Sequence, residues 1–315
     1  MNNGVEKSLK PLLANIALHG MINDTENHFP KKKCREDGSW NQGYKPRIIR
    51  YADDFVVRHE DYEVILQCKN LIAQWLEKVG LEIKPSKTRI CHALNDIRID
   101  GKMEKAGFNF LGFNIRSYPV GKHRSGKTGG KTNGISISKT IGFKTLIKPS
   151  KKKILAHHEA IKEVIKSHKK APQAGLIKGL NPIIRGWCNY YRTVASKETI
   201  SSEDSKLWSM HRAWTVSRKK KKTPLLDALN KYFSYGKGKH GRWTFQTKNY
   251  VLYYHAETEI KRHTLVKPEA SPYDGNWTYW SKRRGIYTGT PTRVAKLLKK
   301  QKGICPNAAL VKAVT

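Results

Sequence analysis

Residues 47–58 read RIIRYADDFVVR, in which two short apolar runs flank a pair of adjacent aspartates. The runs, Ile48-Ile49 and Phe55 to Val57, are rich in β-branched and aromatic residues and predict the two strands of a hairpin. Asp53 and Asp54 then lie at its turn, where neither carboxylate is forced into a core. Because Mg²⁺ prefers oxygen ligands, the stretch predicts a site for catalytic magnesium. The alternative is an ordinary Asp-Asp turn, since Asp favours turns by itself.

Further sequence blocks follow the hairpin in a specific order. Apolar residues recur at helical spacing between residues 61 and 79, and Gly80 is placed to cap that helix. Gly80 also begins the sequence GLEI, which is followed by Lys87-Thr88, and residues 108–113 read FNFLGF. This succession resembles the second half of the palm domain in group II intron reverse transcriptases, the intron-encoded maturases.

The resemblance implies roles for the hairpin residues. Asp53 and Asp54 would be catalytic metal ligands, and Tyr51 and Ala52 would lie near primer and template, with packing of the Tyr51 ring as the alternative. An active palm of this family needs a third carboxylate from an earlier strand, and the 50 residues before Tyr51 contain no strand with a suitable ligand. We therefore expect a weak or incomplete Mg²⁺ site, and no polymerase activity from the chain alone.

The resemblance continues through the thumb and the maturase-specific region of the family. Pro149-Ser150 predicts the start of one helix, Pro172 separates it from the next, and a third helix is expected from Ser202 to about Lys219. Residues 179–191, GLNPIIRGWCNYY, resemble the signature of the maturase-specific region. Helical periodicity predicts that the aromatic residues of this signature pack in the core rather than stack on bases: Trp187, Tyr190 and Tyr191.

The charge of the chain points independently to a polyanionic partner. Lys plus Arg number 61 against 25 for Asp plus Glu, which gives a formal net charge of +36. A compact chain this basic repels itself, and nucleic acid would relieve that repulsion. No stretch approaches the roughly 20 apolar residues of a membrane-spanning helix. We expect nucleic-acid contacts at Lys151, Lys152, Lys153, Arg185, Arg218, Lys219, Lys220, Lys221, Lys222, Lys282, Arg283 and Arg284.

Cysteine usage predicts a reducing compartment without structural zinc. The five cysteines are scattered, odd in number and partly on helical stripes, which argues against a disulfide framework. Longer members of the family continue into an endonuclease that opens with a C-x-x-C pair. Here Cys305 is followed by no second cysteine, so we expect neither zinc nor an endonuclease.

The N-terminus lacks a cleavable signal, so we expect a bacterial cytoplasmic protein, with an organelle as the alternative.

Two other stretches carry weaker patterns. Residues 121–134 include SGKTGGKT, which lacks the first glycine of a phosphate-binding loop, and they predict only a basic Gly-rich loop. Residues 242–266 alternate like a small β-meander. The sequence ASPYDGNWTYW at 270–280 resembles a segment that follows the maturase-specific region in bacterial relatives. A unit so rich in Lys, Arg, Tyr and Trp would bind nucleic acid or form a structural appendage.

We therefore predict an α+β fold. A partial palm, with the hairpin packed on helices at about 8–20 and 61–79, would occupy residues 1–118. A basic Gly-rich loop, a helical thumb and maturase domain, a small basic β-containing unit and a truncated terminal tail would occupy, in order, residues 119–144, 145–235, 236–290 and 291–315. The tail would contain a short helix.

Three functional hypotheses remain open from the sequence. The first is a maturase fragment that binds group II intron RNA, with DNA as a second candidate partner, and assists splicing. The second is a reverse transcriptase that works only with a separately encoded N-terminal half. The third is a non-functional remnant of a mobile element.

Overall fold

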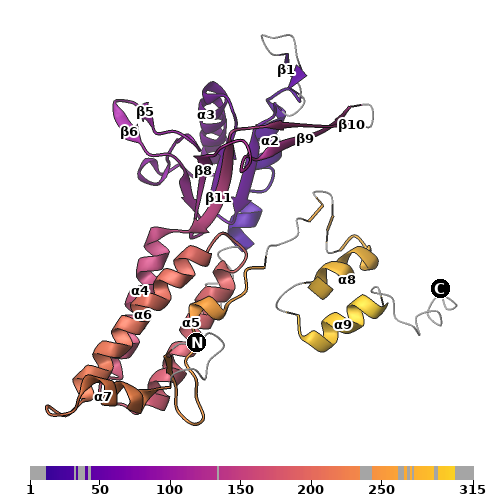
Figure 1. Ribbon diagram of the computed structural model, residues 1–315. Coiled ribbons are helices and arrows are strands. Elements are labelled where there is room, and N and C mark those ends of the chain that lie inside the picture. The colour runs from indigo at the N-terminus through magenta and orange to yellow at the C-terminus, as the bar shows by residue number, and fades with distance from the viewer. Residues whose placement is uncertain are drawn as a thin grey trace. The chain divides into compact units, whose positions relative to one another are not determined.

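The computed structural model divides the chain into two compact units, residues Met1–Leu111 and Gly112–Thr315, which are described separately below (Figure 1). Both units contain helices and strands, so the predicted α+β class is confirmed. The structure describes residues 12–31, 33–34, 40–41, 44–132, 135–234, 243–261, 266–267, 270–271, 273–286 and 290–301.

The first unit is built around the predicted hairpin. β3 (Arg47–Tyr51) pairs antiparallel with β4 (Asp54–Arg58), and Tyr51 lies opposite Asp54. Two helices, α2 (Met21–Asn27) and α3 (Tyr62–Lys78), pack with this hairpin. The small core that joins them contains Leu18, Met21, Ile48, Ile72 and Leu76.

Helix α3 follows the sequence prediction closely because its signals are local. Asp61 caps the N-terminus by accepting a hydrogen bond from the Glu63 amide at 3.0 Å. At the other end, Gly80 adopts a φ of +72°, and the Leu81 amide bonds back to the Leu76 carbonyl at 2.9 Å. This left-handed cap is the conformation that glycine adopts most readily.

The helix expected over residues 8–20 ends earlier than predicted. Residues 12–17 are helical, and a turn separates them from α2, while residues 8–11 lie outside the described part of the chain. Gly20 adopts a φ of +88°, and this left-handed conformation marks the break between the two helices. The remaining elements of the first unit are β1 (Lys33–Cys34), β2 (Trp40–Asn41), η1 (Pro85–Lys87), β5 (Ile97–Ile99), β6 (Lys102–Glu104) and β7 (Phe108–Phe110).

The second unit opens with a pair of long antiparallel strands. β8 (Phe113–Pro119) pairs with β11 (Phe143–Pro149) along its whole length. Between them, β9 (Lys127–Thr132) pairs with β10 (Ile135–Thr140), so the expected basic Gly-rich loop is wrong for this stretch. The sequence ISISKT at 135–140 has the period of a strand, and a backbone ladder accepts glycines in its partner because it needs no side chain.

Four helices follow, and the first two begin where the prolines predicted. They are α4 (Lys151–Ser167), α5 (Gln173–Tyr191), α6 (Lys197–Arg218) and α7 (Leu225–Tyr232), with α4 and α6 side by side (Figure 1). Helix α6 begins before the predicted Ser202, at Lys197. The shared core is apolar and contains Ile161, Leu176, Ile177, Leu180, Ile184, Cys188, Leu207 and Trp214.

The segment after α7 is not the predicted β-meander. Within residues 243–261 the extended structure is limited to β13 (Thr244–Phe245), which pairs with β12 (Phe233–Ser234), and a single bridge between Gln246 and Val251. A short turn of helix, η2 (His255–Glu257), follows. Apolar side chains of this segment pack into the core of the helices instead of forming a larger sheet: Phe245, Leu252 and Tyr254 belong to that core.

Two helices lie near the end of the chain, α8 (Trp277–Ile286) and α9 (Thr292–Gln301), and they pack against each other. Helix α9 confirms the short helix expected after residue 290, whereas α8 lies where a β-containing unit was expected. None of the helices in the described ranges is both long enough and apolar enough to cross a membrane.

Candidate metal site and nucleic-acid interface

The acidic pair lies at the tip of the β3–β4 hairpin. Asp53 is in the two-residue turn and Asp54 is the first residue of β4, and both side chains are exposed. Ala52 precedes them with a φ of +54°, a left-handed conformation that is unfavourable for a residue with a Cβ atom. The Arg50 guanidinium donates to the Ala52 carbonyl at 3.0 Å and to the Ala14 carbonyl at 3.3 Å. Arg50 thus holds the turn against residues 12–17.

This pair supplies only part of a magnesium coordination shell. Two exposed carboxylates at one turn offer oxygen ligands to a hard cation. Among the residues that the structure describes, no group of three or more His, Cys, Asp or Glu side chains is arranged to hold a metal ion. Asp53 and Asp54 are thus the carboxylates that this turn offers to a cation. Cys305 lies outside the described residues.

Tyr51 is accessible rather than packed. Its side chain is 65% exposed, which disfavours the alternative of a packing role. Ala52 is half-buried at the neighbouring turn position.

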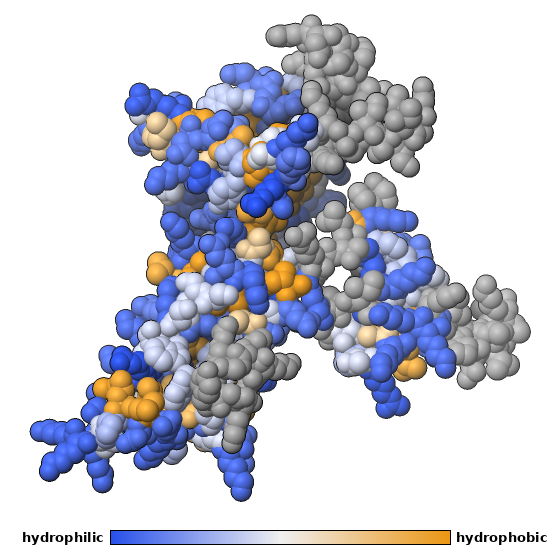
Figure 2. Space-filling model, viewed as in Figure 1, coloured by the Kyte–Doolittle hydropathy of each residue, from blue (hydrophilic) through white to orange (hydrophobic). Residues whose placement is uncertain are grey.

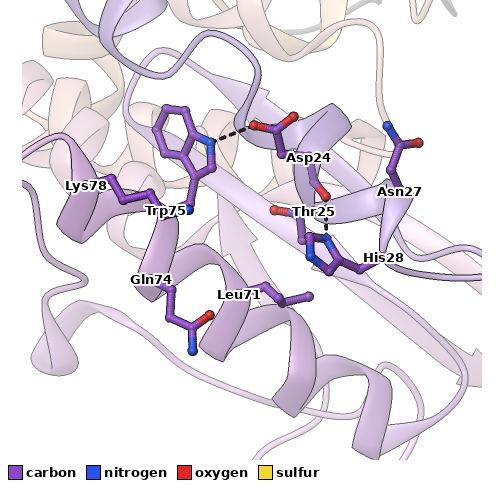
Figure 3. A pocket seen from close by; sticks show the side chains of 8 residues that line it. All are labelled: Asp24, Thr25, Asn27, His28, Leu71, Gln74, Trp75 and Lys78. Atoms are coloured by element: carbon purple, nitrogen blue, oxygen red, sulfur yellow. Dashed lines mark hydrogen bonds between the residues drawn. The ribbon is translucent and has the colours of Figure 1, made fainter.

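A pocket in the first unit contains none of the predicted site residues. It encloses about 420 Å³ between α2 and α3 (Figure 3). The Trp75 indole donates to the Asp24 carboxylate at 3.0 Å, and His28 bonds to the Asp24 carbonyl at 2.7 Å. Its lining is Asp24, Thr25, Asn27, His28, Leu71, Gln74, Trp75 and Lys78. Because the Trp75 indole, Asp24 and His28 already bond to one another, they are less available to a ligand, and we assign no site to this pocket.

The basic residues predicted to meet nucleic acid have different environments. Hydrophilic residues cover much of the face shown in Figure 2. Lys151, Lys152 and Lys153 are all exposed in the first turn of α4. Cations at a helix N-terminus face the positive end of the helix dipole, an arrangement that a bound anion would stabilise.

Arg185 belongs to a row of cations and tyrosines along α5. Its guanidinium carbon lies 5.0 Å from the ring centre of Tyr253, and the Lys178 ammonium lies 4.6 Å from that of Tyr250. Between them, Asn181 donates to the Val251 carbonyl at 2.9 Å and accepts from the Tyr253 amide at 2.8 Å. The row, Lys178, Arg185, Tyr250 and Tyr253, is called the α5 cation–tyrosine row below.

Three members of the α5 cation–tyrosine row were not predicted from the sequence: Lys178, Tyr250 and Tyr253. Lys178 and Arg185 are seven residues apart, which places them on one face of a helix. This spacing is a signal from which Lys178 could have been predicted together with Arg185. Tyr250 and Tyr253 come from a distant segment, and no local pattern connects them to α5.

Arg218 has internal partners that the sequence did not suggest. Its guanidinium carbon stacks 4.1 Å from the Trp214 ring centre, and its Nε and Nη2 donate to the carbonyls of Lys169 at 3.1 Å and Ala171 at 2.7 Å. Arg218 therefore joins the end of α6 to the connection between α4 and α5. Lys219 also bonds internally, to the Thr223 carbonyl at 3.1 Å. The neighbouring Lys220, Lys221 and Lys222 are exposed.

The predicted cations of α8 are partly engaged by aromatic rings. Arg283 lies 5.0 Å from the ring centre of Tyr279, and Lys267 approaches the same ring at 5.4 Å. Lys282 and Arg284 are exposed.

The signature aromatic residues are packed as predicted in two of three positions. Tyr191 is 3% exposed and donates to the Gly112 carbonyl at 3.2 Å, and Trp187 stacks on His157 with ring centres 4.6 Å apart. Tyr190 is 53% exposed and stacks on Phe113 at 5.1 Å, so its predicted core position is wrong. Adjacent helical residues point about 100° apart, so Tyr190 and Tyr191 do not share one face.

A buried polar chain in the second unit was also missed. The His157 and His255 imidazoles bond through their Nε2 atoms at 2.8 Å, and His255 Nδ1 pairs with the Asp204 carboxylate at 2.8 Å. Asp204 also accepts from the backbone amides of His255 at 2.7 Å and Ala256 at 2.8 Å. Burial, followed by the charges of His255 and His158, lowers the pKa of His157 to about 3. Since α4, α6 and η2 each contribute one member, no local sequence signal could have found this chain.

Comparison with known families agrees with this geometry. The reverse transcriptase (RNA-dependent DNA polymerase) family model matches residues 7–115, which include the hairpin with its two aspartates. The first unit is thus of the reverse transcriptase class. The model for the group II intron maturase-specific domain matches residues 154–233, which contain nearly all of α4 to α7. The chain belongs to the group II intron reverse transcriptase and maturase family. No curated protein matches the chain.

Proposed function

We propose that this protein is a maturase that binds the RNA of a group II intron and assists its splicing. The observation that carries the proposal is the α5 cation–tyrosine row, which lies partly within the maturase-specific match. Lys178 and Arg185 are exposed and held in place by tyrosine rings. Ordered cations beside aromatic rings suit the phosphates and bases of a folded RNA.

The maturase action follows from binding alone. A protein that binds the native form of the intron, and not its misfolded forms, stabilises the native form by mass action. The RNA itself then carries out the splicing chemistry. The exposed lysines at the start of α4, Lys151 to Lys153, would add phosphate contacts to those of the α5 cation–tyrosine row.

Splicing of a group II intron in near-physiological salt tests the proposal. Purified protein should accelerate splicing, and the variant Lys178→Ala/Arg185→Ala should lose most of that acceleration. A matched control is Lys162→Ala/Lys166→Ala, which removes two exposed lysines elsewhere on the helical unit. Splicing that proceeds at the same rate with and without the wild-type protein would reject the maturase function.

A polymerase function is the second candidate, and the exposed Asp53 and Asp54 favour it. The purified chain should extend no annealed primer, because the two carboxylates at one turn are too few ligands to hold two metal ions. Addition of a separately encoded N-terminal half should then restore extension, and Asp53→Ala should abolish it. Primer extension by the chain alone would show that the metal site is complete without a partner.

A further inference from the structure

The strands β8 and β11 present a basic face that neither family match covers in full. The reverse transcriptase match ends at residue 115, and the match to the maturase-specific domain begins at residue 154. The register places Arg116 opposite Leu146, and Tyr118 opposite Lys144, so these side chains lie on one face of the strand pair. Lys148 follows Lys144 and Leu146 on the same face, since alternate residues of a strand share a face.

Two cations on this face converge on one aromatic ring. The Arg116 guanidinium carbon lies 5.4 Å from the ring centre of Tyr118, and the Lys148 ammonium lies 5.6 Å from it. Both distances allow a cation–π attraction, which offsets part of the repulsion between the two charges. Tyr118 therefore holds two positive groups close together in a defined arrangement.

The surrounding protein compensates these charges only weakly. The Lys148 ammonium lies 3.5 Å from the Glu198 carboxylate, whose side chain is 89% exposed, and such surface pairs contribute little. The Nε atom of Arg116 is inaccessible to solvent and has no hydrogen-bond partner among the described residues. A buried donor without an acceptor is unfavourable, and an anion at the guanidinium would reduce the local positive charge. Lys144, on the same face, is exposed and adds a third positive charge.

We propose that this face, formed by Arg116, Tyr118, Lys144 and Lys148, binds the sugar-phosphate backbone of single-stranded RNA. Lys144 and Lys148 are four residues apart on β11, which is about 13 Å, and Arg116 on β8 lies level with Leu146 between them. Along the strand direction the three cations therefore recur at intervals similar to those of successive phosphates in an extended strand. β11 leads directly into α4, whose positive N-terminus and first-turn lysines lie next along the chain. The proposal rests on the proposed RNA-binding function and extends it to a second, separate surface.

Fluorescence anisotropy with a labelled single-stranded RNA tests the proposal across a salt series. The variant Arg116→Ala/Lys148→Ala removes two phosphate contacts, so the log–log salt slope should become less steep by about 1.4, at about 0.7 per contact. Lys162→Ala/Lys166→Ala removes the same charge elsewhere and should change the slope much less. Tyr118→Phe should bind as wild type because it keeps the ring, and Tyr118→Leu should weaken binding.

Several outcomes would overturn the proposal. It fails if the double variant keeps the wild-type slope, or changes it no more than the control. It also fails if an acidic polypeptide of matched charge displaces the RNA equally well, because the surface would then be a general polyanion site. If Arg116→Ala/Lys148→Ala does not fold, as judged by circular dichroism, Lys148→Gln alone should reduce the slope by about 0.7, and an unchanged slope counts against the site. Wild-type protein that binds no RNA would reject the proposed function itself.

Discussion

Two aspartate sites in this molecule have opposite surroundings. Asp53 and Asp54 are exposed at a hairpin turn in the first unit, and their carboxylates face solvent. Asp204, in the second unit, is 5% exposed and accepts hydrogen bonds from three N–H groups of His255 and Ala256. The first arrangement leaves carboxylates available to a cation, and the second uses a carboxylate to fix the fold. The residue type is the same, so the surroundings decide the role.

Among single substitutions, removing the buried carboxylate should have the largest effect. Asp204→Ala leaves two backbone amides and one imidazole without their acceptor, and loss of one member of a buried charged network costs about 3–5 kcal/mol. We expect the second unit to unfold at much lower urea concentration, as followed by circular dichroism. A variant with wild-type stability would show that the buried chain does not hold η2 in place.

Acidification should destabilise the second unit through its buried histidines. Burial lowers the pKa of His157 to about 3 and that of His211 to about 4, below the ordinary value near 6.5. At a pH between the lowered pKa of each histidine and 6.5, the unfolded chain binds more protons than the folded chain does. Stability is therefore complete above pH 6.5 and should fall on acidification towards pH 4, by about 1.4 kcal/mol per pH unit for each histidine.

Urea denaturation at pH values between 7 and 4 measures this effect. His211→Phe replaces one buried imidazole, so its stability should depend less on pH than that of the wild type. Equal pH dependence in both proteins would mean that His211 does not titrate on unfolding.

Gly112→Ala should have an intermediate effect. Gly112 has a φ of +81°, and a Cβ atom there would lie 3.1 Å from the Tyr191 hydroxyl and 3.3 Å from Lys153 Cγ. Backbone strain of this kind costs about 1–3 kcal/mol. The measurement is the urea midpoint of the variant. As a comparison, Ala52→Gly places a glycine at the left-handed position of the hairpin, where it removes the strain of a Cβ atom, and should not destabilise the first unit.

Removing the exposed carboxylates should have the smallest effect on stability. Asp53→Ala and Asp54→Ala should change the free energy of unfolding by no more than about 0.5 kcal/mol, because surface side chains without partners contribute little. The same substitutions should weaken any Mg²⁺ affinity, as isothermal titration calorimetry would measure. A large loss of stability would assign the pair a structural role like that of Asp204.

Much of the local structure could be predicted because its causes are local. The β3–β4 hairpin, α3 with its Asp61 and Gly80 caps, and the starts of α4 and α5 all follow from neighbouring residues. The failures occur where distant segments compete for the same residues. The aromatic residues of 243–254 have a strand-like pattern, but the helical core buries them instead.

The residues expected to contact nucleic acid also divide into those whose environment is local and those whose environment depends on distant segments. From the sequence, Arg185 and Arg218 were assigned the same role, as contacts to nucleic acid. In the structure Arg185 is exposed along a row of tyrosines, whereas Arg218 donates to two carbonyls of the connection before α5. The difference depends on acceptors that are near in space and far in sequence.

By itself, the sequence determined the family, the positive charge, the acidic hairpin and most of the helices, because periodicity, capping and motif order act over a few residues. Only the tertiary structure decided which charged groups remain available to RNA or metal, and which are used internally. The physical reason is that a polar group that loses contact with water must find a partner within the fold. For Asp204 that partner is supplied by residues about 50 positions away in the chain, at His255 and Ala256.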